Sequence, residues 1–198
     1  GAMKHIRILF AALLTLSIAP VALAANVNFD GVNQNGFELL RQDYSGVEIV
    51  HGVQQLSIED LNVNGQTMKT LSIPGVVLPN DEGAPNLPGN GRMIAIPEGA
   101  AASFRIISSK MEVIENIDIA PAPKIPFETD DSPPAYIPDP RIYGANAFYP
   151  DNPVKISDPQ QLRGVDFAIL GITPFQYNPV TRELRVYTEL RVEVTFNG

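Results

Sequence analysis

Residues 164–196 read GVDFAILGITPFQYNPVTRELRVYTELRVEVTF and carry the clearest structural signal in the chain. From Leu184 to Phe196 apolar and polar residues alternate, with an interruption at Thr188. Such alternation indicates a strand with one face in a core and the other in water. The apolar run 165–172 predicts a second strand, and the proline- and asparagine-bearing segment 174–182 predicts a turn. We therefore expect a long antiparallel β-hairpin here.

The rest of the chain is divided into short segments by 18 prolines and 15 glycines. Apolar residues make up 44% of the chain, which suffices for a sizeable core. Asn64-Gly65 predicts a tight hairpin, and Ser109-Lys110 predicts a bend between two paired strands. Further short strands are expected at 47–50, 53–61, 68–77, 92–96, 102–108, 111–119 and 154–156. The pattern predicts an all-β fold, an antiparallel β-sandwich or jelly-roll-like single domain spanning residues 25–198.

The first 24 residues have the composition of a targeting segment. We interpret residues 1 and 2 as a cloning remnant. A basic start at Lys4 to Arg7 precedes the apolar run 8–19, and Ala22-Leu23-Ala24 provides a small-x-small cleavage pattern. The apolar run is too short to span a bilayer, which favours a signal peptide, Met3 to Ala24, over a membrane anchor. We expect an exported, periplasmic or extracellular protein without stable membrane insertion after cleavage.

Composition argues against several functions. The chain has no cysteine, so it contains no disulfide framework, thiol nucleophile or thiolate metal site. Without Lys4 and Arg7 it carries 12 basic and 22 acidic residues, and no basic cluster suits nucleic acid. His51, beside a predicted turn, is expected on the surface, and no histidine pair is available for zinc. Because no paired carboxylates lie on predicted strands, we expect neither an enzyme nor a cofactor or metal site.

Residues 120–141, APAPKIPFETDDSPPAYIPDPR, are unusually rich in proline. Proline cannot donate to a sheet ladder, so this segment predicts an extended surface loop within the one domain. Loops of this length are often functional, although a plain crossover between two sheets is the alternative. Its acidic residues suggest calcium, but their spacing fits no EF-hand loop, and a solvated acidic loop is preferred: Glu128, Asp130, Asp131 and Asp139.

Four aromatic residues near the end of this loop are candidates for an interface: Tyr136, Tyr143, Phe148 and Tyr149. Aromatic side chains are enriched where proteins meet a partner. The same side chains would also serve to cover an edge of the sandwich. Both interpretations stay open at this point.

Several segments, taken in order, resemble the N-terminal prodomain of gingipain-type (C25) cysteine peptidases. The most specific are Pro174 to Thr181 and Leu184 to Glu189. The others are Gly83 to Pro88, Arg92 to Ile96, Ile107 to Lys110, Ile119 to Pro121, Phe148 to Pro150 and Leu162 to Gly164. The resemblance covers residues 83–196, whereas residues 26–82 match only in being rich in strands.

This resemblance implies a β-sandwich prodomain that keeps a secreted cysteine peptidase latent and assists its folding. Its partner would be the catalytic domain of the same precursor, with a loop placed in the active-site cleft. A stand-alone secreted β-sandwich that binds carbohydrate or a surface protein is the alternative function.

The resemblance also points to residues of the loop. In Arg-specific members an Arg of the inhibitory loop fills the specificity pocket, and the matching position here is Glu128. A carboxylate cannot pair with an acidic pocket, because like charges would be buried together. Lys124 and Arg141 are therefore further candidates for the inhibitory loop, and ordinary solvent-exposed loop charge is the alternative for all three.

Overall fold

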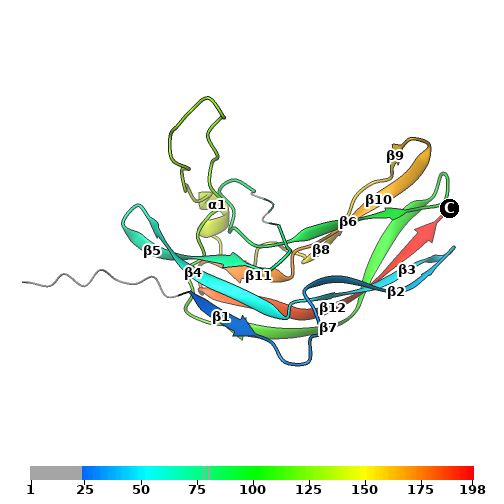
Figure 1. Ribbon diagram of the computed structural model, residues 1–198, viewed down its shortest axis with the longest axis horizontal. Helices are drawn as coiled ribbons and strands as arrows, with labels where there is room; N and C mark the ends of the chain where they lie inside the picture. Colours follow the sequence, from blue (N-terminus) through cyan, green and yellow to red (C-terminus); the bar gives the residue numbers. More distant parts are fainter. Residues whose placement is uncertain (1–23, 78, 80) are drawn as a thin grey trace, which may run out of the picture.

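A computed structural model describes residues 24–77, 79 and 81–198, so the signal peptide expected from Met3 lies almost wholly outside the described residues (Figure 1). The described chain is built from strands and one short helix. They are β1 (Ala25–Asn28), β2 (Gly36–Asp43), β3 (Gly46–Gly52), β4 (Gln55–Val63), β5 (Gln66–Ser72), β6 (Asn90–Ala95), β7 (Ala101–Ile114), α1 (Pro140–Tyr143), β8 (Val154–Ile156), β9 (Gln160–Leu162), β10 (Val165–Ile172), β11 (Phe175–Asn178) and β12 (Glu183–Asn197). The all-β, antiparallel prediction is confirmed. Within this part of the chain, no helix has the length and apolar character needed to cross a membrane.

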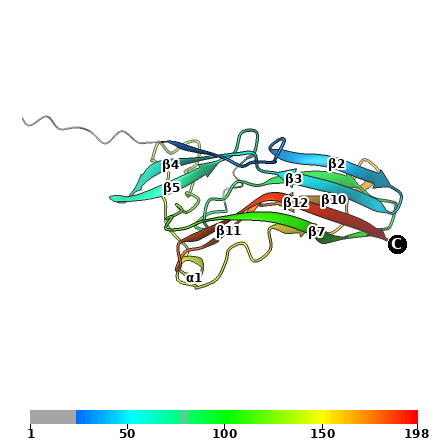
Figure 2. The ribbon, with the colours of Figure 1, turned by 90° about the horizontal axis from the view of Figure 1, so that it is seen from below.

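The strands form three antiparallel sheets. In the first, β12 pairs with β7 along one edge and with β11 and then β3 along the other, and β2 adds to β3. In the second, β10 lies between β6 on one side and β8 and β9 on the other. The third sheet has the order β1-β4-β5. Figure 2 shows β12 running along the body between β3 and β7.

The strand β12 contributes to two hydrophobic clusters. Leu184 and Val186 pack with side chains of β4, β5 and β11 in the first cluster. Leu190, Val192 and Val194 pack with side chains of β3 and β10 in the second cluster. Every second residue from Leu184 to Val194 is buried, as the alternation in the sequence predicts.

The interruption at Thr188 marks the passage of β12 from one cluster to the next. Thr188 is buried on the inward face, its carbonyl accepts the Val53 N–H at 3.0 Å, and its hydroxyl donates to the Lys110 carbonyl at 3.4 Å. The pairing of β12 with β7 shifts by one residue between Tyr187 and Glu189. Such a bulge bends a strand and increases its twist. The buried threonine is thus hydrogen-bonded at the bend.

The expected hairpin over 164–196 is only partly correct. β10 and β12 lie in different sheets and do not pair with one another. The hairpin is formed by β11 and β12, with β11 inside the segment that was expected to be a turn. Alternation reports which face of a strand is buried, and it does not identify the neighbouring strand. Thr173 and Pro174 connect the two sheets between the buried residues Ile172 and Phe175.

Other strand predictions were confirmed or corrected. Asn64-Gly65 forms the tight turn between β4 and β5, with φ of 52° and 86°. The pair of strands expected at 102–108 and 111–119 is instead the single strand β7, and Ser109-Lys110 lies inside it opposite β12. That dipeptide has neither Gly nor Pro, so nothing there forces a reversal of the chain.

His51 was expected on the surface, and that prediction is wrong. Its side chain is fully buried, with Nε2 2.8 Å from Oδ1 of Asn90 and its ring edge-on to Phe37 at a centroid distance of 5.1 Å. The strand β3 extends to Gly52, so His51 continues the inward-facing series begun by Val47 and Ile49. It therefore joins the first and second sheets through Asn90 of β6.

The burial of His51 predicts a loss of stability in mild acid. Burial lowers the pKa of His51 from 6.5 to about 4, against the opposing effect of the Asn90 hydrogen bond. In the unfolded chain the histidine takes up a proton as the pH falls through 6.5, its ordinary pKa. In the folded protein His51 stays neutral until the pH approaches 4. The free energy of unfolding should therefore be highest above about pH 6.5 and fall by roughly 3 kcal/mol toward pH 4.

Urea unfolding between pH 4 and pH 8 measures this dependence. The variant His51→Gln should lose most of the slope in that window. Asp43, whose pKa is lowered from 3.8 to about 2 by hydrogen bonds from Ser45, contributes to the slope only at the lower end of this window and equally in both proteins. An unchanged slope in His51→Gln would contradict the assignment.

Removing the Tyr177 hydroxyl should destabilise the fold. This hydroxyl donates to the Ile117 carbonyl at 2.9 Å and accepts the Ile119 N–H at 3.3 Å, inside the first cluster. Tyr177→Phe leaves two buried backbone groups without that partner, at a cost of about 1–3 kcal/mol. Chemical denaturation measures the difference, and Tyr44→Phe at a 97% exposed position is the control. Equal stabilities of the two variants would contradict the expectation.

Candidate functional site

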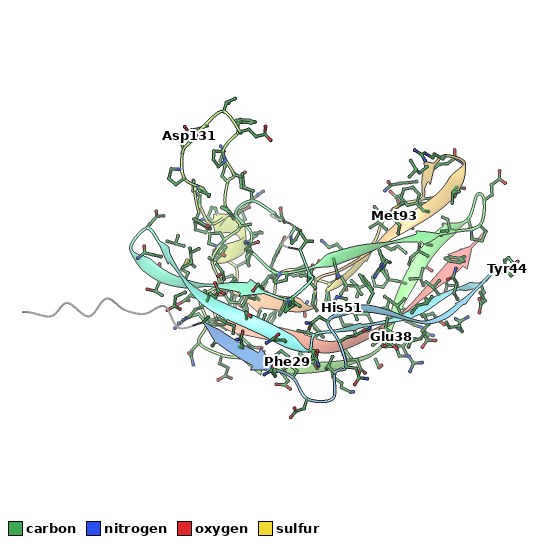
Figure 3. The ribbon with its side chains drawn as sticks, viewed as in Figure 1. Phe29, Glu38, Tyr44, His51, Met93 and Asp131 are labelled. Carbon is green, nitrogen blue, oxygen red and sulfur yellow. The ribbon has the colours of Figure 1, made fainter. Side chains whose placement is uncertain are left out.

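Residues 123–138 project from the body, and we call this segment the arm (Figure 1). Asp131 lies near its far end (Figure 3). The projecting part is shorter than the predicted loop 120–141. Ala120 and Ala122 are buried in the body, and residues 140–143 form α1.

Both ends of the arm are fastened to Gly83. The Gly83 N–H donates to the Ala122 carbonyl at 3.0 Å, and the Gly83 carbonyl accepts the Asp139 N–H at 2.8 Å. Farther out, the backbones of Lys124 and Ala135 exchange two hydrogen bonds of 2.7 and 3.1 Å. The two limbs of the arm are therefore held in a fixed register at its base.

The tip of the arm is a β-turn that spans residues 127–130. The Phe127 carbonyl accepts the Asp130 N–H at 2.8 Å, which leaves Glu128 and Thr129 at the corners. The Asp130 carboxylate accepts the hydroxyl and the N–H of Ser132, and these bonds lower the pKa of Asp130. The tip is thus ordered by its own hydrogen bonds. The Phe127 side chain is 85% exposed.

The arm and the β9–β10 end of the second sheet rise on the same side of the body and give it a concave outline (Figure 1). Met93 lies on this side (Figure 3). The outer face of the second sheet exposes apolar side chains there: Met93, Leu162, Val165 and Ile169. We call it the apolar face. Beside it is a cavity of about 340 Å³ whose lining includes Asn86, Gly91, Tyr149, Lys155 and Gly171.

Ion pairs cover the outer face of the first sheet. Arg105 pairs with Glu193 at 2.6 Å, and Arg41 lies 3.6 Å from the same carboxylate. Arg191 pairs with Glu48. Exposed pairs contribute little stability each, but they mark a face that is well solvated. The outer face of the first sheet therefore combines ion pairs with exposed apolar side chains of β7 such as Met111 and Val113, whereas the concave side carries the apolar face of the second sheet.

The structure separates the three charged residues proposed for the inhibitory loop. Lys124 lies at the base of the arm and Glu128 at its tip, both exposed. Arg141 lies outside the arm, in α1, where its guanidinium is 2.7 Å from the Asp139 carboxylate. That contact raises the pKa of Arg141 and lowers the pKa of Asp139.

Three of the four aromatic candidates contact the body of the protein itself. The Tyr143 hydroxyl donates to the Ile119 carbonyl at 2.9 Å, the Phe148 ring lies 3.5 Å from the Arg185 guanidinium, and the Tyr149 hydroxyl donates to Asp81. Burial raises the pKa of both tyrosines. The fourth, Tyr136, lines a groove with Ile125 of the arm and residues of β4 and β5. A role of these aromatics in an interface stays a prediction.

Neither Phe127 nor Gly83 is predicted from the sequence to be a site residue. Phe127 could have been noticed as a large apolar residue among prolines and acids. The function of Gly83 depends on contacts with residues about 40 and 55 positions away, which no local pattern reveals. Within the described ranges, no group of three or more His, Cys, Asp or Glu side chains is placed to hold a metal ion.

The fold and the arm define a β-domain that presents a stiffened loop on the same side as an exposed apolar face. The chain belongs to the Propeptide_C25 family, whose model matches residues 30–198. It is 30% identical to Gingipain R2 of Porphyromonas gingivalis over 161 residues, 79% of this chain and 21% of that protein. It is 24% identical to Lys-gingipain of the same organism over 208 residues, 99% of this chain and 12% of that protein. The chain thus spans less than a quarter of these relatives.

Two solved structures have a similar fold. One is described as a complex of the pro- and mature domains of RgpB from Porphyromonas gingivalis, with a TM-score of 0.75 and 27% identity, covering 80% of this chain and 84% of that chain. The other comes from work on the zymogenic latency of gingipain K from the same organism. It has a TM-score of 0.74 and 22% identity, covering 89% of this chain and 100% of that chain.

Gly83→Ala should loosen the arm. Gly83 has φ of 82°, and a Cβ there would lie 3.2 Å from the Ile137 carbonyl oxygen and 3.3 Å from the Asp139 nitrogen. Gly99 has φ of 73° with open space around it, so Gly99→Ala is the matched control. Both variants should lose about 1–2 kcal/mol from backbone strain.

Only Gly83→Ala should also speed cleavage within the arm in limited proteolysis. Mass spectrometry of the first fragments locates the cut. Equal cleavage rates in the two variants would show that Gly83 does not fasten the arm.

Proposed function

We propose that this chain is the prodomain of a gingipain-like cysteine peptidase and keeps that enzyme latent by placing the arm in its active-site cleft. The observation that carries the proposal is the arm itself, fastened at both ends to Gly83 and exposed at its tip. Membership of the C25 propeptide family supports it. So does the likeness to an RgpB pro-domain solved with its mature domain.

The construction of the arm suits a blocking segment. Its prolines restrict the unbound chain, and the Lys124–Ala135 backbone pair fixes the spacing of the limbs. Less conformational entropy is then lost when the arm docks. An arm that is ordered before binding also holds its tip at a defined distance from the body.

The concave side is the proposed docking surface for the catalytic domain. The arm and Met93 of the apolar face lie on this side (Figure 3). Covering apolar surface contributes about 25 cal/mol per Å² removed from water. Lys124, Glu128 and Arg141 are the proposed charged contacts, with Tyr136 at the base of the arm, and Tyr143, Phe148 and Tyr149 support the body beneath.

The partner is the catalytic domain made on the same polypeptide, which is exported with the leader Met3 to Ala24. The prodomain supplies no catalytic residue and assists the folding of its enzyme. A stand-alone module that binds carbohydrate or a surface protein would instead leave peptidase activity unchanged.

Shortening the arm should weaken inhibition without unfolding the body. In the test variant, Asn-Gly replaces residues 125–134, so that Lys124 and Ala135 keep their backbone pair across a two-residue turn. The full chain should inhibit the mature peptidase at micromolar concentration or below. The shortened chain should have an inhibition constant at least about tenfold higher, or ~1.4 kcal/mol.

The single variants Lys124→Ala and Glu128→Ala test the charged contacts, and both should melt like the parent because the residues are exposed. Inhibition constants that neither substitution changes would exclude both as contacts of the cleft. No inhibition by the full chain at micromolar concentration would exclude the latency function.

A further inference from the structure

The arm presents an apolar side chain at its tip. Phe127 is 85% exposed, and among the described large apolar residues only Tyr44, at 97%, is more exposed. Tyr44 lies in the turn between β2 and β3, whereas Phe127 lies on a segment stiffened by proline. Pro126 precedes it directly and fixes the approach of the chain. The carbonyl of Phe127 closes the tip turn, so the position of this residue is set by the backbone.

The charges around Phe127 are almost all negative. Glu128, Asp130 and Asp131 follow it, whereas the one cation of the arm, Lys124, lies at the base where its backbone is paired with Ala135. A pocket that selects Arg or Lys needs negative charge. Such a pocket would face these carboxylates at close range, and juxtaposed like charges cost several kcal/mol.

A neutral, apolar pocket fits the same tip without this conflict. Removing a Phe side chain from water stabilises a complex. Burying the Glu128 carboxylate without a partner would instead oppose binding. With Phe127 inserted, the neighbouring acids can remain at the rim of the pocket in contact with water.

We propose that Phe127 is the residue that the arm inserts into the primary specificity pocket of the restrained peptidase. The enzyme would therefore prefer an aromatic or large aliphatic residue before the scissile bond, and not Arg or Lys. This inference rests on the proposed latency function and adds to it the substrate class of the partner.

The first test measures inhibition of the mature peptidase by variants of the full chain. Phe127→Ala should raise the inhibition constant at least tenfold, Phe127→Arg at least as much, and Phe127→Leu less. Tyr44→Ala is the matched control, because Tyr44 is a 97% exposed aromatic residue that lies outside the arm, in the turn between β2 and β3. Its inhibition constant should stay within twofold of the parent, and melting temperatures should agree across the set.

The second test profiles the mature peptidase with peptides that differ only in the residue before the scissile bond: Phe, Leu, Arg, Lys or Glu. The value of kcat/KM for Phe or Leu should exceed that for Arg and Lys at least tenfold. Inhibition by the parent chain together with an unaffected Phe127→Ala, or with a preference for Arg or Lys, would overturn this inference and leave the latency function standing. A parent chain that does not inhibit would overturn both.

Discussion

The strand β12 has to satisfy two hydrophobic clusters at once, with Leu184 and Val186 in one and Leu190, Val192 and Val194 in the other. A strand keeps its inward face only as long as its period of two is unbroken. The polar residue at the passage, Thr188, stays inward and is hydrogen-bonded to the chain on either side. The three sheets are arranged around this strand, because β3, β7 and β11 pair with it and the other two sheets pack on it.

The same arrangement fixes the place of the arm. Tyr177 of β11, next to β12, binds the Ile117 carbonyl and the Ile119 N–H, and Tyr143 binds the Ile119 carbonyl. The chain then reaches Ala122, whose carbonyl accepts the Gly83 N–H and whose N–H donates to the Ala84 carbonyl. A continuous series of hydrogen bonds thus leads from the central sheet to the base of the arm. The direction in which the arm projects is therefore a property of the core.

Local patterns in the sequence were sufficient for the fold class and for several elements. The alternation of β12 and the Asn64-Gly65 turn both follow from residues close together in the chain. Patterns of this kind do not report which strands become neighbours, so the prediction of a hairpin formed by β10 and β12 was wrong. The surface position expected for His51 was wrong for a related reason, because strand β3 continues two residues past its predicted end.

The candidate site was harder to read than the fold. Proline content located the arm, but its limits depend on the contacts of Ala122 and Asp139 with a glycine distant in sequence. Exposure of Phe127 depends on the turn that closes behind it, and the four aromatic candidates differ only in what they touch in three dimensions. The family resemblance pointed to Glu128, and charge pointed to Lys124 and Arg141. The structure spreads these three residues over the tip, the base of the arm and a separate helix.

The double attachment at Gly83 has a consequence for a chain that has been cut. If one peptide bond near the tip is hydrolysed, the two stubs remain bonded to the same glycine, and each fragment keeps strands that pair with the other. A chain cut at the tip would therefore stay assembled as a complex of two fragments. Cleavage at the tip is therefore a separate event from dissociation of the domain from its partner, which requires the contacts of the body to be broken.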